Sequence, residues 1–270
     1  MIPAAFDYAR AETVEHAISL LTEHGDEAKL MAGGHSLLPM MKLRFAFPSV
    51  IVDIGHLSEA SYVRTEGDEV AIGALTRHCD LVASDVLHAE APLISIAASY
   101  VGDPQVRHRG TIGGSVSHAD SAADLPAAVL ASDATLVAQG PNGRRTIAAT
   151  DFFLGYFATA LQPDEMLVEI RVPRTGATGA HYEKFTRRAN DWAIVAVATV
   201  AGRVALANMG GTPVRASATE AALRDGASVA DAAALADDGT EPSGDMHGDS
   251  DYRRHLARVL TARSLTAASN

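Results

Sequence analysis

The sequence predicts an α+β fold built in two parts. Helical and strand-like segments interleave as far as a Gly-Thr-rich break at residues 176–179. Beyond that break, strand-like segments come first and helical segments follow as a group, an order typical of α+β domains. The third observation is a pair of Gly-Gly motifs in the first part, each entered by a short apolar run. We therefore expect one domain over residues 1–175 and another over residues 178–270.

The first part is expected to open with a helix over residues 11–24. Thr13 suits its N-cap and Gly25 its end. Its apolar residues recur at helical spacing, at Val14, Ala17, Ile18 and Leu21. Short apolar runs bounded by turn residues predict the remaining segments. These are strands over 29–31, 50–54 and 166–172, hairpins over 61–72 and 134–147, and helices over 76–83, 92–98 and 120–130.

The second part is expected to begin with an antiparallel set of strands. Apolar, β-branched runs predict strands over residues 182–187, 193–200 and 204–206. Helices are expected at about 215–224, 228–237 and 250–262, by their periodicity. Between the last two helices, residues 237–249 are rich in Gly, Pro, Ser and Asp, which predicts a mobile connection or loop.

Charge and composition exclude several kinds of partner. The chain has 270 residues and a formal net charge of −11, whereas nucleic acids and anionic membranes select for basic surfaces. The longest apolar run, residues 193–201, is too short to span a bilayer, and the N-terminus lacks the features of a signal peptide. We expect a cytoplasmic protein with no membrane insertion and no nucleic-acid partner.

The cysteine and histidine content bounds the metal chemistry. Cys79 is the only cysteine, so an intramolecular disulfide cannot form. Iron–sulfur clusters are normally held by four ligands, mostly cysteines, so this chain cannot hold one by itself. The 11 histidines show no H-E-x-x-H spacing. We expect no metal site in this chain.

The two Gly-Gly motifs are the candidate functional feature. The first reads Ala32-Gly-Gly-His-Ser36 and the second Thr111-Ile-Gly-Gly-Ser115. Paired glycines can take positive φ and gather backbone N–H groups into a concavity that suits a phosphate. Either motif alone is equally consistent with a tight turn, but two of them favour the two phosphates of one dinucleotide. Neither matches the Rossmann or P-loop pattern.

In this order, the two motifs resemble the double FAD signature of the medium subunit of molybdenum hydroxylases. That family includes the flavin subunits or domains of carbon monoxide dehydrogenase, nicotine dehydrogenase and xanthine dehydrogenase. The similarity continues through residues 103–107, 117–126, 182–185 and 252–256, and so spans essentially the whole chain. The resemblance implies a p-cresol methylhydroxylase-like FAD-binding domain with α+β subdomains of about 1–56 and 57–175. A small C-terminal α+β domain of the carbon monoxide dehydrogenase flavoprotein type, an antiparallel sheet with helices, would follow.

The resemblance also implies a set of FAD-binding positions. The first motif would hold the diphosphate with backbone N–H groups, and the second would contact it from the other subdomain. A cation at Lys184 would stabilise reduced, anionic flavin. No catalytic residue is expected, because the flavin carries the chemistry. The expected cofactor-binding residues are Leu30, Met31, Ala32, Gly33, Gly34, His35, Ser36, Val101, Thr111, Ile112, Gly113, Gly114, Ser115, Asp124, Leu167, Lys184 and Trp192.

Several of these side chains also have a purely structural interpretation. Asp124 is consistent with a helix N-terminal charge, and an isolated lysine such as Lys184 is more often at the surface. Trp192, the sole tryptophan, could shield the flavin ring or be a core or interface residue. His35 could bind the cofactor or a partner, or simply orient the motif backbone. Ser115 stands where family members often have asparagine, which puts one side-chain hydrogen bond to the cofactor in doubt.

The resemblance implies an FAD-dependent electron-transfer subunit of a molybdenum-containing oxidoreductase. A large molybdopterin-binding subunit would oxidise the substrate, and a small subunit would carry two [2Fe–2S] centres. The medium subunit would take electrons from those centres and pass them to an external acceptor, in a dimer of heterotrimers. A stand-alone flavin oxidoreductase of the same superfamily is the alternative. A scaffold subunit that has lost flavin is a third reading, disfavoured by the intact glycine motifs.

Overall fold

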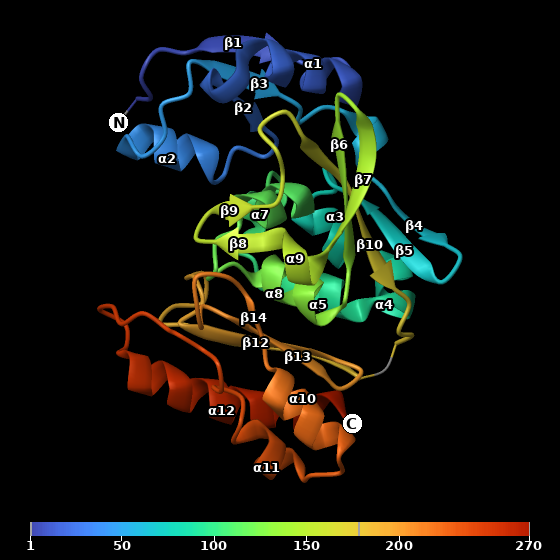
Figure 1. Ribbon diagram of the computed structural model, residues 1–270, viewed down its shortest axis with the longest axis vertical. Helices are drawn as coiled ribbons and strands as arrows, with labels where there is room; N and C mark the ends of the chain where they lie inside the picture. The colour runs from blue at the N-terminus through green and yellow to red at the C-terminus, as the bar shows by residue number, and fades with distance from the viewer. Residues whose placement is uncertain (1, 178, 270) are drawn as a thin grey trace.

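The computed structural model describes residues 2–177 and 179–269, in which three larger sheets are stacked with helices along the long axis of the molecule (Figure 1). The N-terminal sheet is parallel, in the order β1-β3-β2. Thr13 accepts a hydrogen bond from the N–H of His16 and Gly25 ends the first helix with φ 53°, as predicted. The elements of this region are β1 (Asp7–Arg10), α1 (Val14–His24), β2 (Ala28–Met31), α2 (Leu37–Leu43) and β3 (Val50–Asp53).

The central sheet is antiparallel and five-stranded, in the order β4-β5-β10-β6-β7. Both predicted hairpins are present as β4–β5 and β6–β7. The strands are β4 (Val63–Glu66), β5 (Glu69–Gly73), β6 (Thr135–Gly140), β7 (Gly143–Ala148) and β10 (Met166–Pro173). The helices are α3 (His78–Val82), α4 (Asp85–Glu90), α5 (Pro92–Ser99), α6 (Pro104–Arg107), α7 (Ile112–His118), α8 (Asp124–Ala131) and α9 (Ala149–Phe152). A small hairpin, β8 (Phe153–Gly155) with β9 (Ala158–Thr159), was not expected.

The C-terminal sheet is antiparallel in the order β11-β12-β13-β14, which agrees with the predicted strand set. It consists of β11 (Ala180–Phe185), β12 (Val195–Val200), β13 (Arg203–Ala207) and β14 (Val214–Arg215). The helices that follow are α10 (Ser217–Arg224), α11 (Val229–Ala233) and α12 (Ser250–Ala268). The α+β prediction is therefore confirmed.

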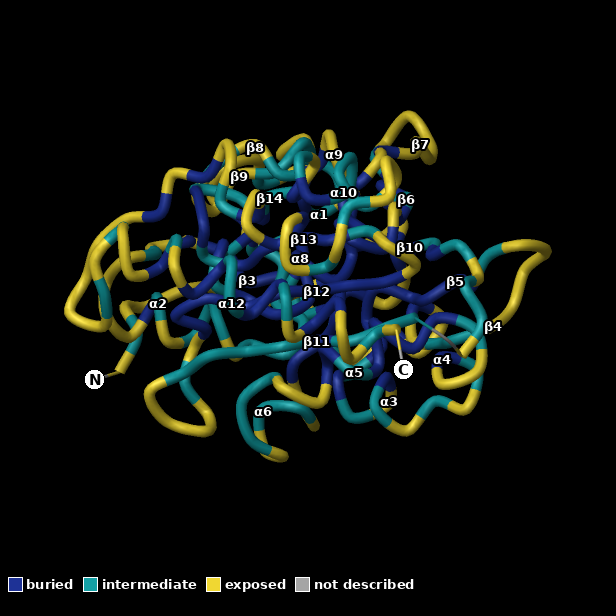
Figure 2. Tube along the Cα trace, turned by 90° about the horizontal axis from the view of Figure 1, so that it is seen from below, coloured by how far each residue is buried: buried dark blue, intermediate teal, exposed yellow. Residues whose placement is uncertain are grey.

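The helices α5 and α8 form a layer that two sheets share. Their apolar side chains belong to one continuous core with residues of the central sheet and of the C-terminal sheet. The other face of the C-terminal sheet packs against α12. Because both faces are covered, all six residues of β12 are buried, and Figure 2 shows this strand crossing the interior. This explains why the segment 193–200 is apolar apart from Thr199.

Two sequence interpretations need correction. The second glycine motif is not a loop, because Ile112, Gly113 and Gly114 form the first turn of α7. The segment 237–249 is tethered rather than free: the side chains of Arg253, Arg254 and Arg258 on α12 bind Asp245, Thr240 and Asp237, respectively. The predicted break at residues 176–179 includes Thr178, which lies outside the described residues.

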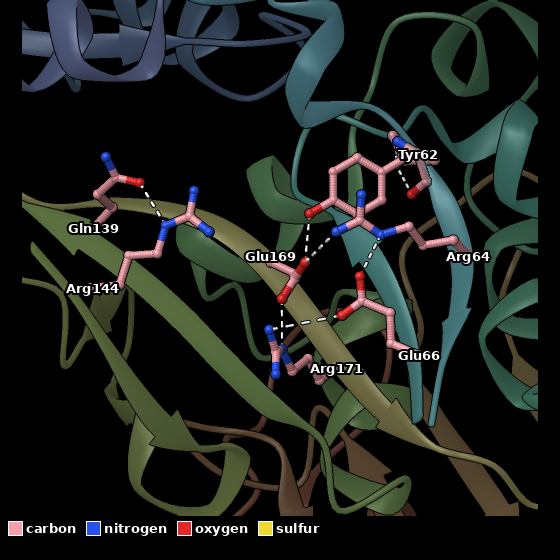
Figure 3. Close-up of polar contacts among 8 residues, drawn as sticks. Tyr62, Arg64, Glu66, Gln139, Arg144, Glu169 and Arg171 are labelled. Carbon is pink, nitrogen blue, oxygen red and sulfur yellow. Dashed lines mark hydrogen bonds and ion pairs between the residues drawn. The ribbon is translucent and has the colours of Figure 1, made fainter. Parts of the chain in front are cut away.

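A polar network occupies the face of the central sheet that points away from the shared helix layer (Figure 3). Glu169 on β10 is buried and accepts hydrogen bonds from the Tyr62 hydroxyl at 2.5 Å and from Arg171 Nε at 2.6 Å. Arg64 lies over the ring of Tyr62, 4.2 Å from its centroid. Burial acts to raise the pKa of Glu169, but the bonds from Tyr62 and Arg171 hold it below its usual value. The network stabilises the sheet and does not line the cleft described below.

Candidate functional site

A cleft of about 740 Å³ lies where the three regions of the chain meet. This volume falls within the range of roughly 300–1,000 Å³ that is typical of small-molecule and cofactor sites. All the predicted cofactor-binding residues line it except Ile112, whose side chain is fully buried in the core instead. The lining set comprises Leu30, Met31, Ala32, Gly33, Gly34, His35, Ser36, Val101, Thr111, Gly113, Gly114, Ser115, Asp124, Leu167, Lys184 and Trp192.

The first glycine motif supplies free backbone donors to the cleft. It connects the end of β2 to the start of α2, and Gly34 takes φ 75°, as a glycine can without strain. The N–H groups of Gly33, Gly34, His35 and Ser36 have no hydrogen-bond acceptor within residues 2–177 and 179–269. Buried or partly buried backbone donors are normally paired. Four consecutive unpaired donors on a cleft wall are therefore suited to an anionic ligand.

The second glycine motif uses its backbone donors within the protein. The N–H of Gly113 bonds the carbonyl of Ala74 at 2.8 Å, and the N–H of Gly114 bonds the Thr111 hydroxyl at 3.1 Å. A Cβ at Gly113 would lie 2.5 Å from the Cβ of Ala74. The prediction of positive φ is thus right for Gly34 and wrong for Gly33, Gly113 and Gly114. Ala74 leaves no room for a side chain at Gly113, and Gly114 lies in the first turn of α7.

A buried ion pair forms one wall of the cleft. Lys184 on β11 donates to Asp124 Oδ2 at 2.9 Å and to the carbonyl of Tyr100 at 3.1 Å. The Tyr182 hydroxyl donates to Asp124 Oδ1 at 2.8 Å. Burial raises the pKa of Asp124, while Lys184 and Tyr182 act to lower it. Burial, followed by the charge of Asp124, also raises the pKa of Tyr182 well above its usual value. Lys184 is therefore not a surface residue, with a side chain only 4% exposed.

Trp192 and His35 lie at the open part of the site. Trp192 is 58% exposed although it is apolar, and it follows β11 on the segment that leads into β12. His35 is exposed on the first glycine motif. The core interpretation of Trp192 is therefore wrong, whereas shielding of a ring in the cleft and contact with a partner both remain compatible with its position.

Several further lining residues were not assigned to the site from the sequence, among them His78, His118 and Phe157. His78 is 4% exposed, and burial, reinforced by Arg107 and His35, lowers its pKa to about 4. Burial also lowers the pKa of His118, whose ring lies 5.0 Å from that of Phe157. Phe157 has φ 55°, which is uncommon for a bulky residue. The only sequence feature that could have predicted a role for Phe157 in the site is its position in the short Gly-Tyr-Phe turn between β8 and β9.

Comparison with known proteins agrees with this geometry. Residues 4–175 match the model of the FAD binding domain in molybdopterin dehydrogenase, and residues 180–268 match the carbon monoxide dehydrogenase flavoprotein C-terminal domain. The chain therefore belongs to the family of FAD-binding medium subunits of molybdenum hydroxylases. It is an FAD-binding subunit of the molybdenum hydroxylase type, and hence a subunit of an oxidoreductase.

Individual relatives match over nearly their full length. The carbon monoxide dehydrogenase medium chain of Hydrogenophaga pseudoflava is 43% identical, over 99% of this chain and 98% of that one. The alpha subunit of the 6-hydroxypseudooxynicotine dehydrogenase complex of Paenarthrobacter nicotinovorans is 38% identical, over 99% and 96%. A solved carbon monoxide dehydrogenase from Hydrogenophaga pseudoflava, which lacks the Mo-pyranopterin moiety, superimposes with a TM-score of 0.95 at 46% identity, over 99% of this chain and 98% of that chain.

The residues present fit an FAD. Its diphosphate needs hydrogen-bond donors, and the first glycine motif offers four that are otherwise unpaired. Lys184 uses two of its three ammonium hydrogens within the protein and has no third acceptor among the described residues. In the same part of the chain, no group of three or more His, Cys, Asp or Glu side chains is arranged to hold a metal ion. No helix there is both long enough and apolar enough to cross a membrane.

Proposed function

We propose that this flavin subunit transfers electrons within a molybdenum-containing dehydrogenase. It would accept them from the [2Fe–2S] clusters of a small partner subunit and deliver them to an external acceptor. A large partner subunit with a molybdopterin cofactor would oxidise the substrate. We further propose a dimer of heterotrimers in the cytoplasm, and domains over residues 1–175 and 178–270.

The unpaired donors of Gly33, Gly34, His35 and Ser36, facing the same cleft as Lys184, are the observation that carries this proposal. The donors would hold the diphosphate of FAD without any cationic side chain, which suits a chain of net charge −11. Bound FAD supplies the one- and two-electron redox chemistry. Lys184 would hold a positive charge beside the reduced ring, and Asp124 fixes the position of that ammonium.

The names of the relatives support the expected partners. Several describe a medium chain or a subunit of a dehydrogenase complex, which implies companion chains in those proteins. This chain spans nearly the full length of such relatives. With Cys79 as its only cysteine, it would depend on a partner for the iron–sulfur clusters.

The decisive experiment is purification of the tagged chain from its native source, followed by absorption spectroscopy and peptide identification. We expect FAD, a cysteine-rich small chain and a molybdenum-containing large chain to co-purify. The Gly34→Val variant should lose FAD, because a β-branched residue is strained at φ 75° and would crowd Leu38. A colourless wild-type protein would refute the flavin site. A yellow chain that has no partners and oxidises an organic substrate directly would refute the electron-transfer role.

A further inference from the structure

The segment that carries Trp192 is anchored by side chains far away in the sequence. After β11, residues 186–194 return to β12, and the N–H of Ile194 closes the connection on the carbonyl of Phe185 at 2.9 Å. The backbone carbonyls of Ala193 and Ile194, directly after Trp192, then need donors. The last pair of the β12–β13 ladder is Ala196 with Ala207, so the β13 backbone does not supply them.

Asn208 supplies donors at the point where that ladder stops. Its Nδ2 donates to the carbonyl of Ala193 at 2.7 Å and to that of Ile194 at 3.3 Å. The residue takes φ 61°, a left-handed conformation that asparagine tolerates better than most residues. This turn leaves its own N–H free to bond the carbonyl of Ser121 at 2.7 Å. Ser121 is buried and lies three residues before Asp124. Asn208 thus connects the Asp124 wall of the cleft to the Trp192 segment.

Arg253 holds the same segment from the opposite side. This α12 residue is only 2% exposed, and its guanidinium donates to the carbonyl of Ile194. A second guanidinium nitrogen pairs with Asp245 at 2.6 Å. A buried arginine is costly to desolvate, so its place on this carbonyl needs a reason beyond the packing of α12.

We propose that Asn208 and Arg253 are positioning residues that hold Trp192 at the mouth of the flavin cleft. Trp192 is largely exposed, so apolar burial does not fix it, and the two carbonyls behind it are the atoms through which it is held. We call the hydrogen bonds from Asn208 and Arg253 to these two carbonyls the clamp. The clamp keeps the indole of Trp192 at a fixed place relative to a ligand bound in the cleft. This inference rests on the proposed flavin site, because the consequence of the clamp is the approach of Trp192 to the flavin ring.

The test uses the fluorescence of Trp192, the only tryptophan in the chain. In Asn208→Asp, the residue still tolerates positive φ, but a carboxylate faces the two carbonyl oxygens and cannot donate to them. Arg253→Gln removes the guanidinium that donates to Ile194 and leaves a shorter, uncharged side chain. Arg263→Gln makes the same change of charge on the same helix at a side chain that is 65% exposed, and it serves as the matched control. Circular dichroism establishes that each variant is folded.

In flavin-free protein, we expect the anisotropy of Trp192 emission to fall in Asn208→Asp and in Arg253→Gln, but not in Arg263→Gln. In FAD-loaded protein, we expect flavin to quench Trp192 emission in the wild type and to quench it less in the same two variants. Asp245→Asn, which weakens the anchor of Arg253 at a more exposed site, should produce a smaller change and replaces either variant that does not fold. If Asn208→Asp and Arg253→Gln fold but leave the anisotropy and the quenching unchanged, the proposal that the clamp positions Trp192 is wrong. A wild type that retains no FAD would instead refute the flavin site, and the flavin-free anisotropy would still decide on the clamp.

Discussion

The carbonyl oxygen of Arg109 occupies the space into which a side chain at Gly33 would project. A Cβ built on Gly33 would lie 2.2 Å from that oxygen and 2.9 Å from the Cα of Gly110. The backbone of the first glycine motif therefore lies directly against Arg109 and Gly110, the two residues that precede the second motif. A glycine is required at position 33 by the neighbouring chain, independently of any ligand.

Gly33→Ala should consequently harm both stability and flavin binding. Because the obstructing atoms are backbone, the first motif must move away from Arg109 and Gly110, at a cost of about 2 kcal/mol or more. Gly155→Ala is the matched control, since a Cβ there would meet no atom within 4 Å and the residue does not line the cleft. We expect its stability to stay within about 1 kcal/mol of the wild type. Urea unfolding with and without FAD measures both effects, and equal losses in the two variants would contradict the interlocked arrangement.

Loss of Lys184 should be more damaging than loss of the whole ion pair. Lys184→Met leaves Asp124 buried with no cation, and breaking a buried pair in this way typically costs about 3–5 kcal/mol. In the double variant Lys184→Met with Asp124→Asn, no buried charge remains, so we expect recovery of a substantial part of that loss. The measurement is the free energy of unfolding of the flavin-free proteins. If the double variant is the less stable of the two, the buried charge is not the cause.

His78 should make the protein less stable as the pH falls from about 6.5 towards 4. Its pKa is about 4 in the folded chain, against an ordinary value of 6.5, so between these values the unfolded chain binds more protons. Stability therefore decreases with decreasing pH in this window. His78→Gln should flatten this part of the profile, whereas His255→Gln, at an exposed position, should not. Parallel stability profiles for the wild type and His78→Gln would exclude a neutral buried imidazole.

Glu169 should stabilise the central sheet chiefly in its ionised form. The pKa of Glu169 is lower in the folded chain than its ordinary value. Its contribution to stability is therefore complete at a pH above the ordinary pKa, and it is lost as the pH falls through the pKa of the folded chain. We expect Glu169→Gln to cost about 2 kcal/mol at neutral pH, the usual size for a charged hydrogen bond. The difference from the wild type should shrink in acid. Glu66→Gln, at a largely exposed pair, should change stability by less than about 0.5 kcal/mol.

Most of the fold was predictable because the local signals agree with the tertiary structure. Thr13 and Gly25 delimit α1 as their chemistry predicts, and turn residues identify both hairpins of the central sheet. The helix α2 and the small β8–β9 hairpin are two of the elements that were missed. Each follows a segment whose glycines or aromatic residues are conformationally ambiguous without the tertiary context.

The site was predictable as a set of residues but not as a geometry. Resemblance identified Lys184 and Asp124, yet only the tertiary structure shows that Asp124 bonds with both Lys184 and Tyr182. The same holds for Asn208, which looks like an ordinary turn residue in the sequence. Its role depends on carbonyls that lie 14 and 15 residues away along the chain. Side-chain pairs of this kind leave no periodic signal for sequence analysis to detect.

The shared helix layer also limits how such a chain can be rearranged during evolution. Because α5 and α8 provide apolar surface to two sheets at once, a gene split near residue 178 would encode two products, each with a bare hydrophobic face. The second product would also take away the lysine that pairs with a carboxylate buried in the first and the tyrosine that donates a hydrogen bond to it. The regions 4–175 and 180–268, which match the two family models, are therefore expected to be inherited together. Exchange of one region without compensating changes in the other would be selected against.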